Sequence, residues 1–215
     1  MLFPISNSDC ESYLLTESSP AYFGKNDEAV LDVEYKDAQV IQRHSFLSNF
    51  DPNDYDILDT IQTQMGENAH NIKFVKDKLN IYSTNGHFKV HKDTPRTPDM
   101  IGTLVVCFPC EFTGGDLVLY TNPPVTFKFD NKSKNTFQWC AFYGDIDHEV
   151  ETVTSGHRIT LTFLINKTKN IAIVNEQSVN LLKTKFHDPT ILPEGGFLGY
   201  GCKYLYSKAS VLVQL

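Results

Sequence analysis

The stretch HEVETVTSGHRITLTFLI, residues 148–165, predicts how this chain folds. Two short runs rich in β-branched residues flank the turn signal TSG, which is typical of two antiparallel strands. In the second run the odd-numbered positions are apolar, and the first three even-numbered positions are Arg158, Thr160 and Thr162. Because successive side chains of a strand point to opposite faces, one face is apolar and the other carries a guanidinium and two hydroxyls.

The rest of the chain repeats this pattern of short strands divided by turn clusters. Eight strands are expected in all, at residues 78–83, 88–91, 101–108, 116–120, 125–129, 138–143, 149–153 and 158–165. Strands that follow one another without helices between them predict an antiparallel sandwich or jelly roll. A helix over residues 51–66, with Asp51 at its cap and Gly66 as its stop, is expected to support one sheet. The fold class is therefore mainly β, in one domain over residues 1–215 with its core at about 78–165 and an extension at each end.

Composition excludes several classes of protein. The 215 residues are 41% hydrophobic and 12% aromatic, as in a globular protein, and the net charge of -7 disfavours nucleic-acid and anionic membrane partners. The first residues lack a basic region, and no apolar run approaches the roughly 18 residues of a membrane span. Five cysteines, an odd number, indicate reduced thiols inside the cell, in cytoplasm or nucleus. Cys107 and Cys110 spell C-x-x-C within a run typical of a buried strand, which favours core thiols over a redox motif.

A candidate metal site begins in the segment GHFKVHKDTPR, residues 86–96. His91 and Asp93 are two residues apart in extended chain, so both can point at one ion. A third ligand is available in His148, and Asp145 or Asp147 is a candidate to orient its ring, unless both are solvated turn residues. Two histidines and one carboxylate on one face of a metal are the ligand set of non-haem Fe(II) oxygenases. His87 fits this pattern less well and is interpreted as a neighbouring or surface residue.

Arg158 predicts an anion in the same pocket. An arginine and threonines on an inward strand face cost free energy unless an anion joins them. The planar guanidinium suits a carboxylate held by two hydrogen bonds, and Thr160 can add its hydroxyl. The metal positions left open by the three ligands can take the 2-oxo acid end of 2-oxoglutarate and then O2, while Arg158 meets the far carboxylate.

The motifs HKDTPR (91–96), FTGGDLVL (112–119) and HEVETVTSGHRIT (148–160) together resemble the Fe(II)/2-oxoglutarate-dependent oxygenases, in their prolyl 4-hydroxylase-like branch. The resemblance spans about residues 78–165 and implies a double-stranded β-helix, which is a jelly roll. It also implies that Tyr82 gives its hydroxyl to 2-oxoglutarate. One departure is that relatives often carry a tyrosine for the cosubstrate on the strand at 101–108, where this chain has Thr103 and Cys107 on the corresponding face.

These observations predict a dioxygenase that uses Fe(II), 2-oxoglutarate and O2, with ascorbate as a candidate reductant, to hydroxylate an unactivated C–H bond. A prolyl residue in a peptide or protein is the first expectation for the substrate, with Arg96 and the C-terminal segment GYGCKYLYS (199–207) candidates for the pocket mouth. A free amino acid or another small metabolite is the alternative, and it would require a further charged anchor. A non-catalytic metal-binding sensor on the same jelly roll is a third reading, which Arg158 disfavours. Oligomeric state is not predicted.

Overall fold

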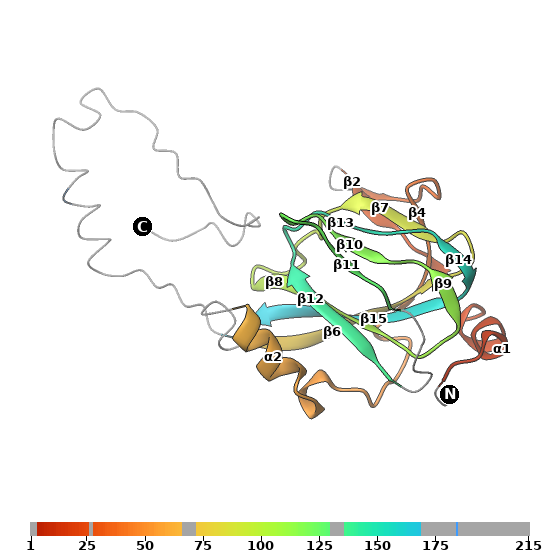
Figure 1. Ribbon diagram of the computed structural model, residues 1–215, viewed down its shortest axis with the longest axis horizontal. Helices are drawn as coiled ribbons and strands as arrows, with labels where there is room; N and C mark the ends of the chain where they lie inside the picture. Colours follow the sequence, from red (N-terminus) through yellow and green to blue (C-terminus); the bar gives the residue numbers. More distant parts are fainter. Residues whose placement is uncertain (1–3, 26–27, 66–71, 130–135, 169–183, 185–215) are drawn as a thin grey trace, which may run out of the picture.

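The computed structural model describes residues 4–25, 28–65, 72–129, 136–168 and Thr184. Two antiparallel sheets face each other in the described part of the chain, and the pocket discussed below lies between them (Figure 1). The predicted mainly β jelly roll is therefore confirmed. The predicted extent of a single domain over all 215 residues stays a prediction.

The larger sheet has the order β1-β5-β6-β15-β8-β12. Its strands are β1 (Ser19–Pro20), β5 (Gln39–Gln42), β6 (Ile72–Tyr82), β15 (Arg158–Lys167), β8 (Met100–Cys107) and β12 (Gln138–Tyr143). The smaller sheet has the order β11-β10-β13-β7-β4. Its strands are β11 (Val125–Phe127), β10 (Leu117–Leu119), β13 (His148–Val150), β7 (His87–His91) and β4 (Lys36–Asp37). Two small pairs complete the strands: β14 (Val153–Gly156) with β9 (Phe112–Gly114), and β2 (Phe23–Lys25) with β3 (Glu28–Val30).

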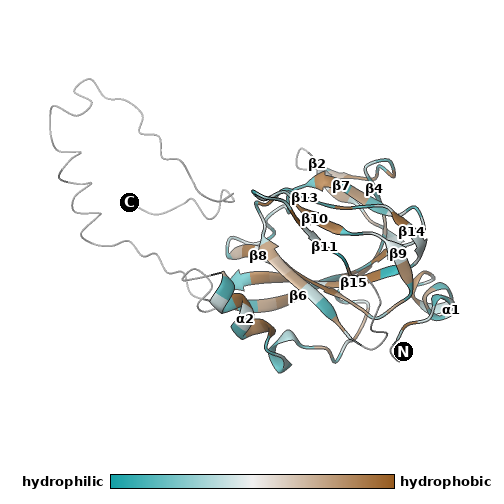
Figure 2. Cartoon of the chain, in the orientation of Figure 1, coloured by the Kyte–Doolittle hydropathy of each residue, from teal (hydrophilic) through white to brown (hydrophobic). Residues whose placement is uncertain are grey.

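The alternation of β15 places its two faces as the sequence predicts. Its apolar side chains are buried, and hydrophobic residues concentrate along β6, β8 and β15 (Figure 2). The ring of Phe163 lies 6.2 Å from that of Phe50, in the segment that leads to the helix. The opposite face of β15 carries Arg158 and Thr160, each 1% exposed, toward the pocket. One strand thus separates the hydrophobic core from the candidate site.

The supporting helix is shorter than predicted. Asp51 does cap it, since its Oδ1 accepts the Asn53 backbone N–H at 2.9 Å, but only the 3-10 turn η2 (Pro52–Asp54) follows. Tyr55 is extended, with φ -131° and ψ 165°, and breaks the segment before α2 (Ile57–Gln64). Ile57 and Ile61 are buried in the core, so the predicted N-terminal helical support is present. The predicted stop at Gly66 lies outside the described residues.

The N-terminal region holds elements that the sequence did not predict. They are the strands β1 to β5 and the helical segments α1 (Asn7–Asp9) and η1 (Cys10–Leu14). The predicted strand at 149–153 is in fact two, β13 and β14, which pair with different strands. Cys10, Cys107, Cys110 and Cys140 are buried free thiols, as expected of core cysteines. No helix within the described residues is long and apolar enough to cross a membrane.

Candidate metal centre

The three predicted ligands meet because two strands of the smaller sheet are neighbours. His91 ends β7, His148 begins β13, and the two residues pair across the antiparallel ladder. Asp93 follows two residues after His91. One potential ligand atom from each of the three lies within 4.8 Å of the others, and His148 Nε2 is 3.8 Å from Asp93 Oδ1. Within the described part of the chain, this is the only such group of metal-ligating side chains.

Backbone carbonyls fix the orientation of both imidazoles. His91 Nδ1 lies 2.8 Å from the Lys89 carbonyl oxygen, and His148 Nδ1 lies 2.9 Å from that of Ile146. A carbonyl only accepts, so each Nδ1 carries its proton and each Nε2 presents a lone pair. Phe88 stacks on the His91 ring with centroids 3.4 Å apart, and Phe142 lies against His148 at 4.6 Å. Both rings are therefore held in the tautomer that binds a metal through Nε2.

The carboxylate of Asp93 is held in place by Thr103. The Thr103 hydroxyl donates to Asp93 Oδ2 at 2.5 Å, which leaves Oδ1 on the side of His148. Thr103 therefore orients a predicted metal ligand, a role that the sequence had not suggested. Asp147, a candidate to orient His148, instead pairs with Lys92 at 3.6 Å on the surface.

His91 is neutral near pH 7. Burial, and next the neighbouring His148, lower the pKa of His91 from 6.5 to about 3. A histidine binds a metal only through an unprotonated nitrogen. The pocket thus holds His91 in its ligating form over the whole physiological range.

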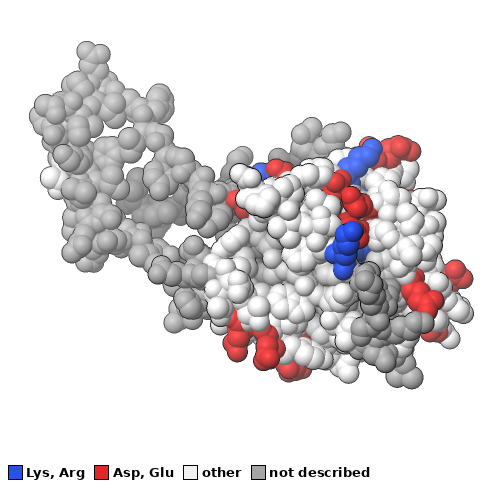
Figure 3. All heavy atoms as spheres, viewed as in Figure 1, with Lys and Arg blue, Asp and Glu red and all other residues white. Residues whose placement is uncertain are grey.

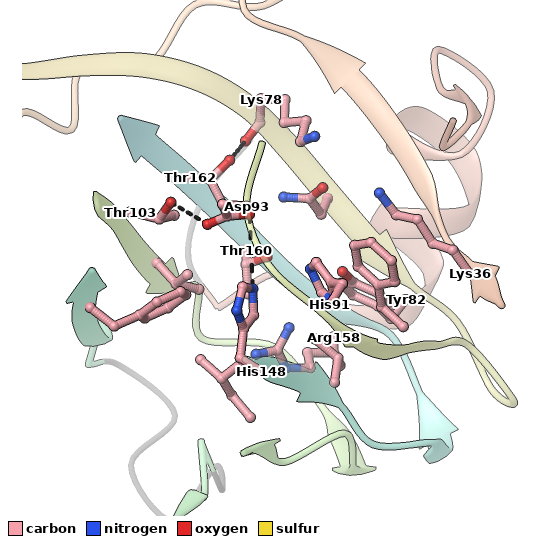
Figure 4. Close-up of a pocket in the computed structure, with 16 residues that line it drawn as sticks. Lys36, Lys78, Tyr82, His91, Asp93, Thr103, His148, Arg158, Thr160 and Thr162 are labelled. Atoms are coloured by element: carbon pink, nitrogen blue, oxygen red, sulfur yellow. Dashed lines mark hydrogen bonds and ion pairs between the residues drawn. The ribbon is translucent and has the colours of Figure 1, made fainter. Parts of the chain in front are cut away.

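A second feature of the pocket is a ladder of polar pairs between β6 and β15. The register places Arg158 opposite Tyr82, Thr160 opposite Asn80, and Thr162 opposite Lys78. All six side chains line the same pocket as the three candidate ligands (Figure 4). The floor of the pocket is therefore polar along its whole length, with a cation at each end.

Within the described residues, Arg158 is a buried cation without a counter-ion. It is 1% exposed, and its Nε and Nη2 have no hydrogen-bond partner in the described structure. The guanidinium carbon lies 5.5 Å from the Tyr82 ring centroid and 5.4 Å from that of Phe129. Buried unpaired donors of this kind cost free energy. An anion bound here would supply the missing acceptors.

Gly115 makes room for the Arg158 side chain. Its φ is +68°, and a Cβ at this position would lie 2.9 Å from Arg158 Cδ and 2.8 Å from Val153 Cγ2. Both glycines of the motif FTGGD, Gly114 and Gly115, have a positive φ. This glycine therefore shapes the wall against which the arginine lies.

Tyr82 and Thr160 lie where a ligand of Arg158 would meet hydroxyl groups. Tyr82 is 5% exposed, and burial raises the pKa of its phenol to about 12. The phenol therefore keeps its proton and remains a donor. Thr160 is 1% exposed and lies on the same strand as Arg158.

Other residues singled out by the sequence lie away from the pocket lining. Arg96, expected near the pocket mouth, pairs with Asp77 through Nη1 and Oδ1 at 2.7 Å. The His87 ring lies near the carbonyl oxygens of Asn85 and Glu34, at 3.0 and 3.2 Å. Cys107 is buried but does not line the pocket. The C-terminal segment 199–207 is outside the described residues.

Sequence reasoning missed two lysines in the pocket. Lys36, from β4, is only 3% exposed, and Lys78 is on β6 with a side chain 17% exposed. The alternation Lys78, Asn80, Tyr82 gave a signal for Lys78, because Tyr82 was already placed on the pocket side. Lys36 had no such signal, because β4 has two residues and pairs with a strand about fifty positions later.

Residues 78–166 match the family model of the 2OG-Fe(II) oxygenase superfamily, where 2OG stands for 2-oxoglutarate. This segment, which contains His91, Asp93, His148 and Arg158, is therefore similar to the 2OG-Fe(II) oxygenases. Similarity to this family supports a dioxygenase enzyme and implies Fe(II) and 2-oxoglutarate as cofactor and cosubstrate. No match was found among curated proteins.

One solved structure supports the fold described above, and two others show a weaker likeness. A prolyl hydroxylase from Trichoplax adhaerens, in complex with a hypoxia inducible factor peptide, has a TM-score of 0.52 and 16% identity, covering 76% of this chain and 77% of its own. A 2OG-Fe(II) oxygenase family protein from Burkholderia pseudomallei has a TM-score of 0.46 and 16% identity, covering 74% of this chain and 79% of its own. A prolyl-4-hydroxylase from Pseudomonas putida has a TM-score of 0.44 and 15% identity, covering 75% of this chain and 84% of its own. At these identities the likeness to the Trichoplax structure concerns the fold alone.

Proposed function

We propose that His91, Asp93 and His148 hold Fe(II), and that Arg158, Thr160 and Tyr82 hold 2-oxoglutarate beside it. The observation that carries this proposal is the buried guanidinium of Arg158, with two nitrogens that lack acceptors, in the same pocket as the three ligands. Two imidazole Nε2 atoms and a carboxylate oxygen suit Fe(II). The residues present therefore fit both the metal and the cosubstrate.

Each residue has a distinct task in this site. The Lys89 and Ile146 carbonyls hold the two histidine tautomers, and the Thr103 hydroxyl holds Asp93. Arg158 donates to the far carboxylate of 2-oxoglutarate, with Thr160 and Tyr82 adding hydroxyl hydrogen bonds. Burial of these donors strengthens each bond, because little water competes. The cosubstrate is thereby oriented toward the metal ligands before a substrate binds.

The reaction is the coupled oxidation that such a site supports. Bound Fe(II) supplies the chemistry that splits O2 between the two substrates. One oxygen atom enters 2-oxoglutarate, which loses CO2 and becomes succinate, and the other becomes the hydroxyl of the product. The protein contributes position, a pocket shielded from water and the order of binding.

The proposed primary substrate is a prolyl residue in a peptide or protein. Proline has a fixed φ, so an extended prolyl chain loses less entropy on entering a pocket. The Trichoplax neighbour is itself a prolyl hydroxylase with a bound peptide, which supports this choice by analogy.

On the face drawn in Figure 3, acidic and basic side chains of the described residues are intermingled, an arrangement that offers a nucleic acid no basic groove.

The test is turnover of prolyl peptides by enzyme reconstituted anaerobically with Fe(II), then supplied with 2-oxoglutarate, ascorbate and O2. We expect succinate to form and the proline to gain one oxygen by mass spectrometry. Omission of ascorbate shows whether this reductant sustains repeated turnover. Absence of both succinate formation and 2-oxoglutarate binding would contradict the proposed role of the pocket.

A free amino acid or small metabolite is the second candidate substrate. The sequence offered no further charged anchor for it, but the pocket contains Lys36 and Lys78. Peptides that all remain unmodified, together with turnover driven by small acids, would replace the prolyl proposal with this one.

A further inference from the structure

We propose that Lys36 and Lys78 form an anion-binding subsite, at the end of the pocket opposite Arg158, that holds a carboxylate of the primary substrate. This inference rests on the proposed function and specifies its substrate: the molecule that is hydroxylated carries a carboxylate close to the reacting carbon. The carboxylate belongs either to a free amino acid or to an acidic side chain or C-terminus of a peptide.

The ladder between β6 and β15 sets the distance between the two cationic ends. Lys78 and Tyr82 are four residues apart on one extended strand, and Tyr82 pairs with Arg158. At about 3.3 Å per residue, the Cα atoms of Lys78 and Tyr82 are roughly 13 Å apart along the sheet. The two carboxylates of 2-oxoglutarate are separated by only about 5 Å, given ordinary C–C bond lengths. A carboxylate bound by Arg158 therefore lies at the Tyr82 end of this ladder, and Lys78 lies at the other end.

The candidate metal ligands lie between the two ends. Figure 4 shows Lys78 and Arg158 on opposite sides of Asp93 and Thr160, with the Lys36 side chain extending into the pocket. The charge of Asp93 acts on Lys36 and Lys78, and also on Tyr82 beside Arg158. A molecule anchored at the lysines would therefore lie next to the metal from the side that 2-oxoglutarate leaves free.

Lys36 is the stronger part of this observation. Among the described residues, its ammonium has no hydrogen-bond acceptor and no ion-pair partner, and its Nζ lies over the Phe88 ring, 4.3 Å from the centroid. A buried ammonium without an anion is unfavourable. An incoming carboxylate would supply the missing partner.

The other charges at this end do not neutralise the two lysines. Asp77 is engaged by Arg96 at 2.7 Å and lies 3.9 Å from Lys78 Nζ, while Asp93 is a predicted metal ligand. Three cations, Lys36, Lys78 and Arg96, thus face two carboxylates, one of which serves the metal. A carboxylate is the anion that both candidate substrate classes can present.

The experiment measures binding of matched acids and amides to protein loaded with Mn(II) and 2-oxoglutarate without O2, by isothermal titration calorimetry. The pairs are free amino acids and their amides, and prolyl peptides with Glu or Gln beside the proline and a free or amidated C-terminus. We expect at least one acid to bind ten or more times as tightly as its amide. The members of that pair, free or peptidic, identify the source of the carboxylate.

Two variants assign the preference to the subsite. Lys36→Met keeps an unbranched side chain of nearly the same length without its charge, and it should reduce the preference for the acid to within about threefold. Lys73→Met is the matched control, since Lys73 is an exposed lysine on the same strand as Lys78, and it should keep the full preference. The inference is overturned if every acid binds no better than its amide, or if Lys36→Met keeps the preference of the wild type.

The same titrations separate this inference from the proposed function. Wild-type protein that binds Mn(II) and 2-oxoglutarate but shows no acid preference contradicts the lysine subsite alone. Protein that binds neither Mn(II) nor 2-oxoglutarate contradicts the proposed function, and the subsite with it.

Discussion

Replacing Arg158 by methionine should have opposite effects on cosubstrate binding and on the stability of the free protein. The guanidinium is 1% exposed and two of its nitrogens lack acceptors, so the free protein bears the cost of a desolvated, partly unpaired cation. Met fills a similar volume between Tyr82 and Phe129 without charge. We therefore expect Arg158→Met to unfold at a higher temperature than wild type when neither metal nor 2-oxoglutarate is present.

The magnitudes follow from the burial of this one group. Removing an unsatisfied buried donor set relieves about 1–3 kcal/mol, and loss of the two cation–π contacts offsets roughly 1 kcal/mol of this. A net gain of about 1 kcal/mol would raise the melting temperature by about 2–4 °C for a chain of this size. Loss of the desolvated charge pair with 2-oxoglutarate should cost about 2–5 kcal/mol, or roughly thirty-fold to several-thousand-fold in Kd.

The assay is a pair of melting curves and a calorimetric titration for each protein. Melting is followed without ligands and with Mn(II) plus 2-oxoglutarate, and the cosubstrate Kd is measured in the presence of Mn(II). Arg43→Met, which changes an exposed arginine, is the control and should match wild type in both. An Arg158→Met protein that binds 2-oxoglutarate with unchanged Kd would refute the assignment of the anchor, and a clearly lower melting temperature without ligands would refute the energetic reasoning.

Three further predictions concern the metal, the pocket wall and pH. His148→Ala should abolish Fe(II) binding, and Thr103→Val, which removes the hydroxyl that holds Asp93, should weaken Fe(II) binding about 10- to 100-fold. Metal titration under anaerobic conditions measures both affinities, and an unchanged affinity in His148→Ala would exclude this residue as a ligand. Gly115→Ala combines a strained φ of +68° with a Cβ 2.9 Å from Arg158 Cδ. It should therefore lower the free energy of unfolding by at least about 1 kcal/mol and raise the 2-oxoglutarate Kd, and a Kd equal to that of wild type would show that the arginine can shift freely. Burial, and next Lys78, lower the pKa of Lys36 from 10.5 to about 7. Between these two pH values the unfolded chain holds a proton that the folded chain lacks, so the stability of the wild type falls as pH drops from 10.5 toward 7. In denaturant titrations Lys36→Met should therefore be more stable than wild type by up to about 5 kcal/mol at or below pH 7, with no difference near pH 10.5, and a difference independent of pH would contradict the burial of a titrating ammonium.

The sequence was sufficient to place candidate site residues wherever one strand carries both the alternation pattern and those residues. The alternation of residues 158–165 separates the apolar face from Arg158 and Thr160, and the structure keeps that separation. His91 and Asp93 are two residues apart, so extended backbone alone brings them to one side. His148 could be added because two histidines and a carboxylate form a recognisable ligand set, even though its position opposite His91 depends on the pairing of β7 with β13.

Sequence reasoning failed where the pairing partner of a short strand is distant. β13 and β14 were predicted as one strand, because nothing in the run at 149–153 marks the point where the chain changes its partner. The carbonyls of Lys89 and Ile146 orient the histidines, but every residue has a carbonyl, so no residue type signals this role. Thr103 was correctly placed facing the site, but the acceptor of its hydroxyl depends on the loop that carries Asp93.

Lys36 shows what kind of residue such reasoning misses. In the sequence it is one charged residue among several acidic ones, and a surface position is the ordinary expectation for lysine. The fold instead pairs its short strand with β7, beside the candidate metal ligands. Lys36 is 3% exposed, and no described carboxylate forms an ion pair with its ammonium. A fold that buries a charge at a cost in stability departs from the local rules that the rest of the sequence follows, and such departures are expected at functional sites. The same burial that lowers the stability of the free protein would strengthen the attraction of Lys36 for a carboxylate, because the ammonium has already lost its water when the substrate arrives.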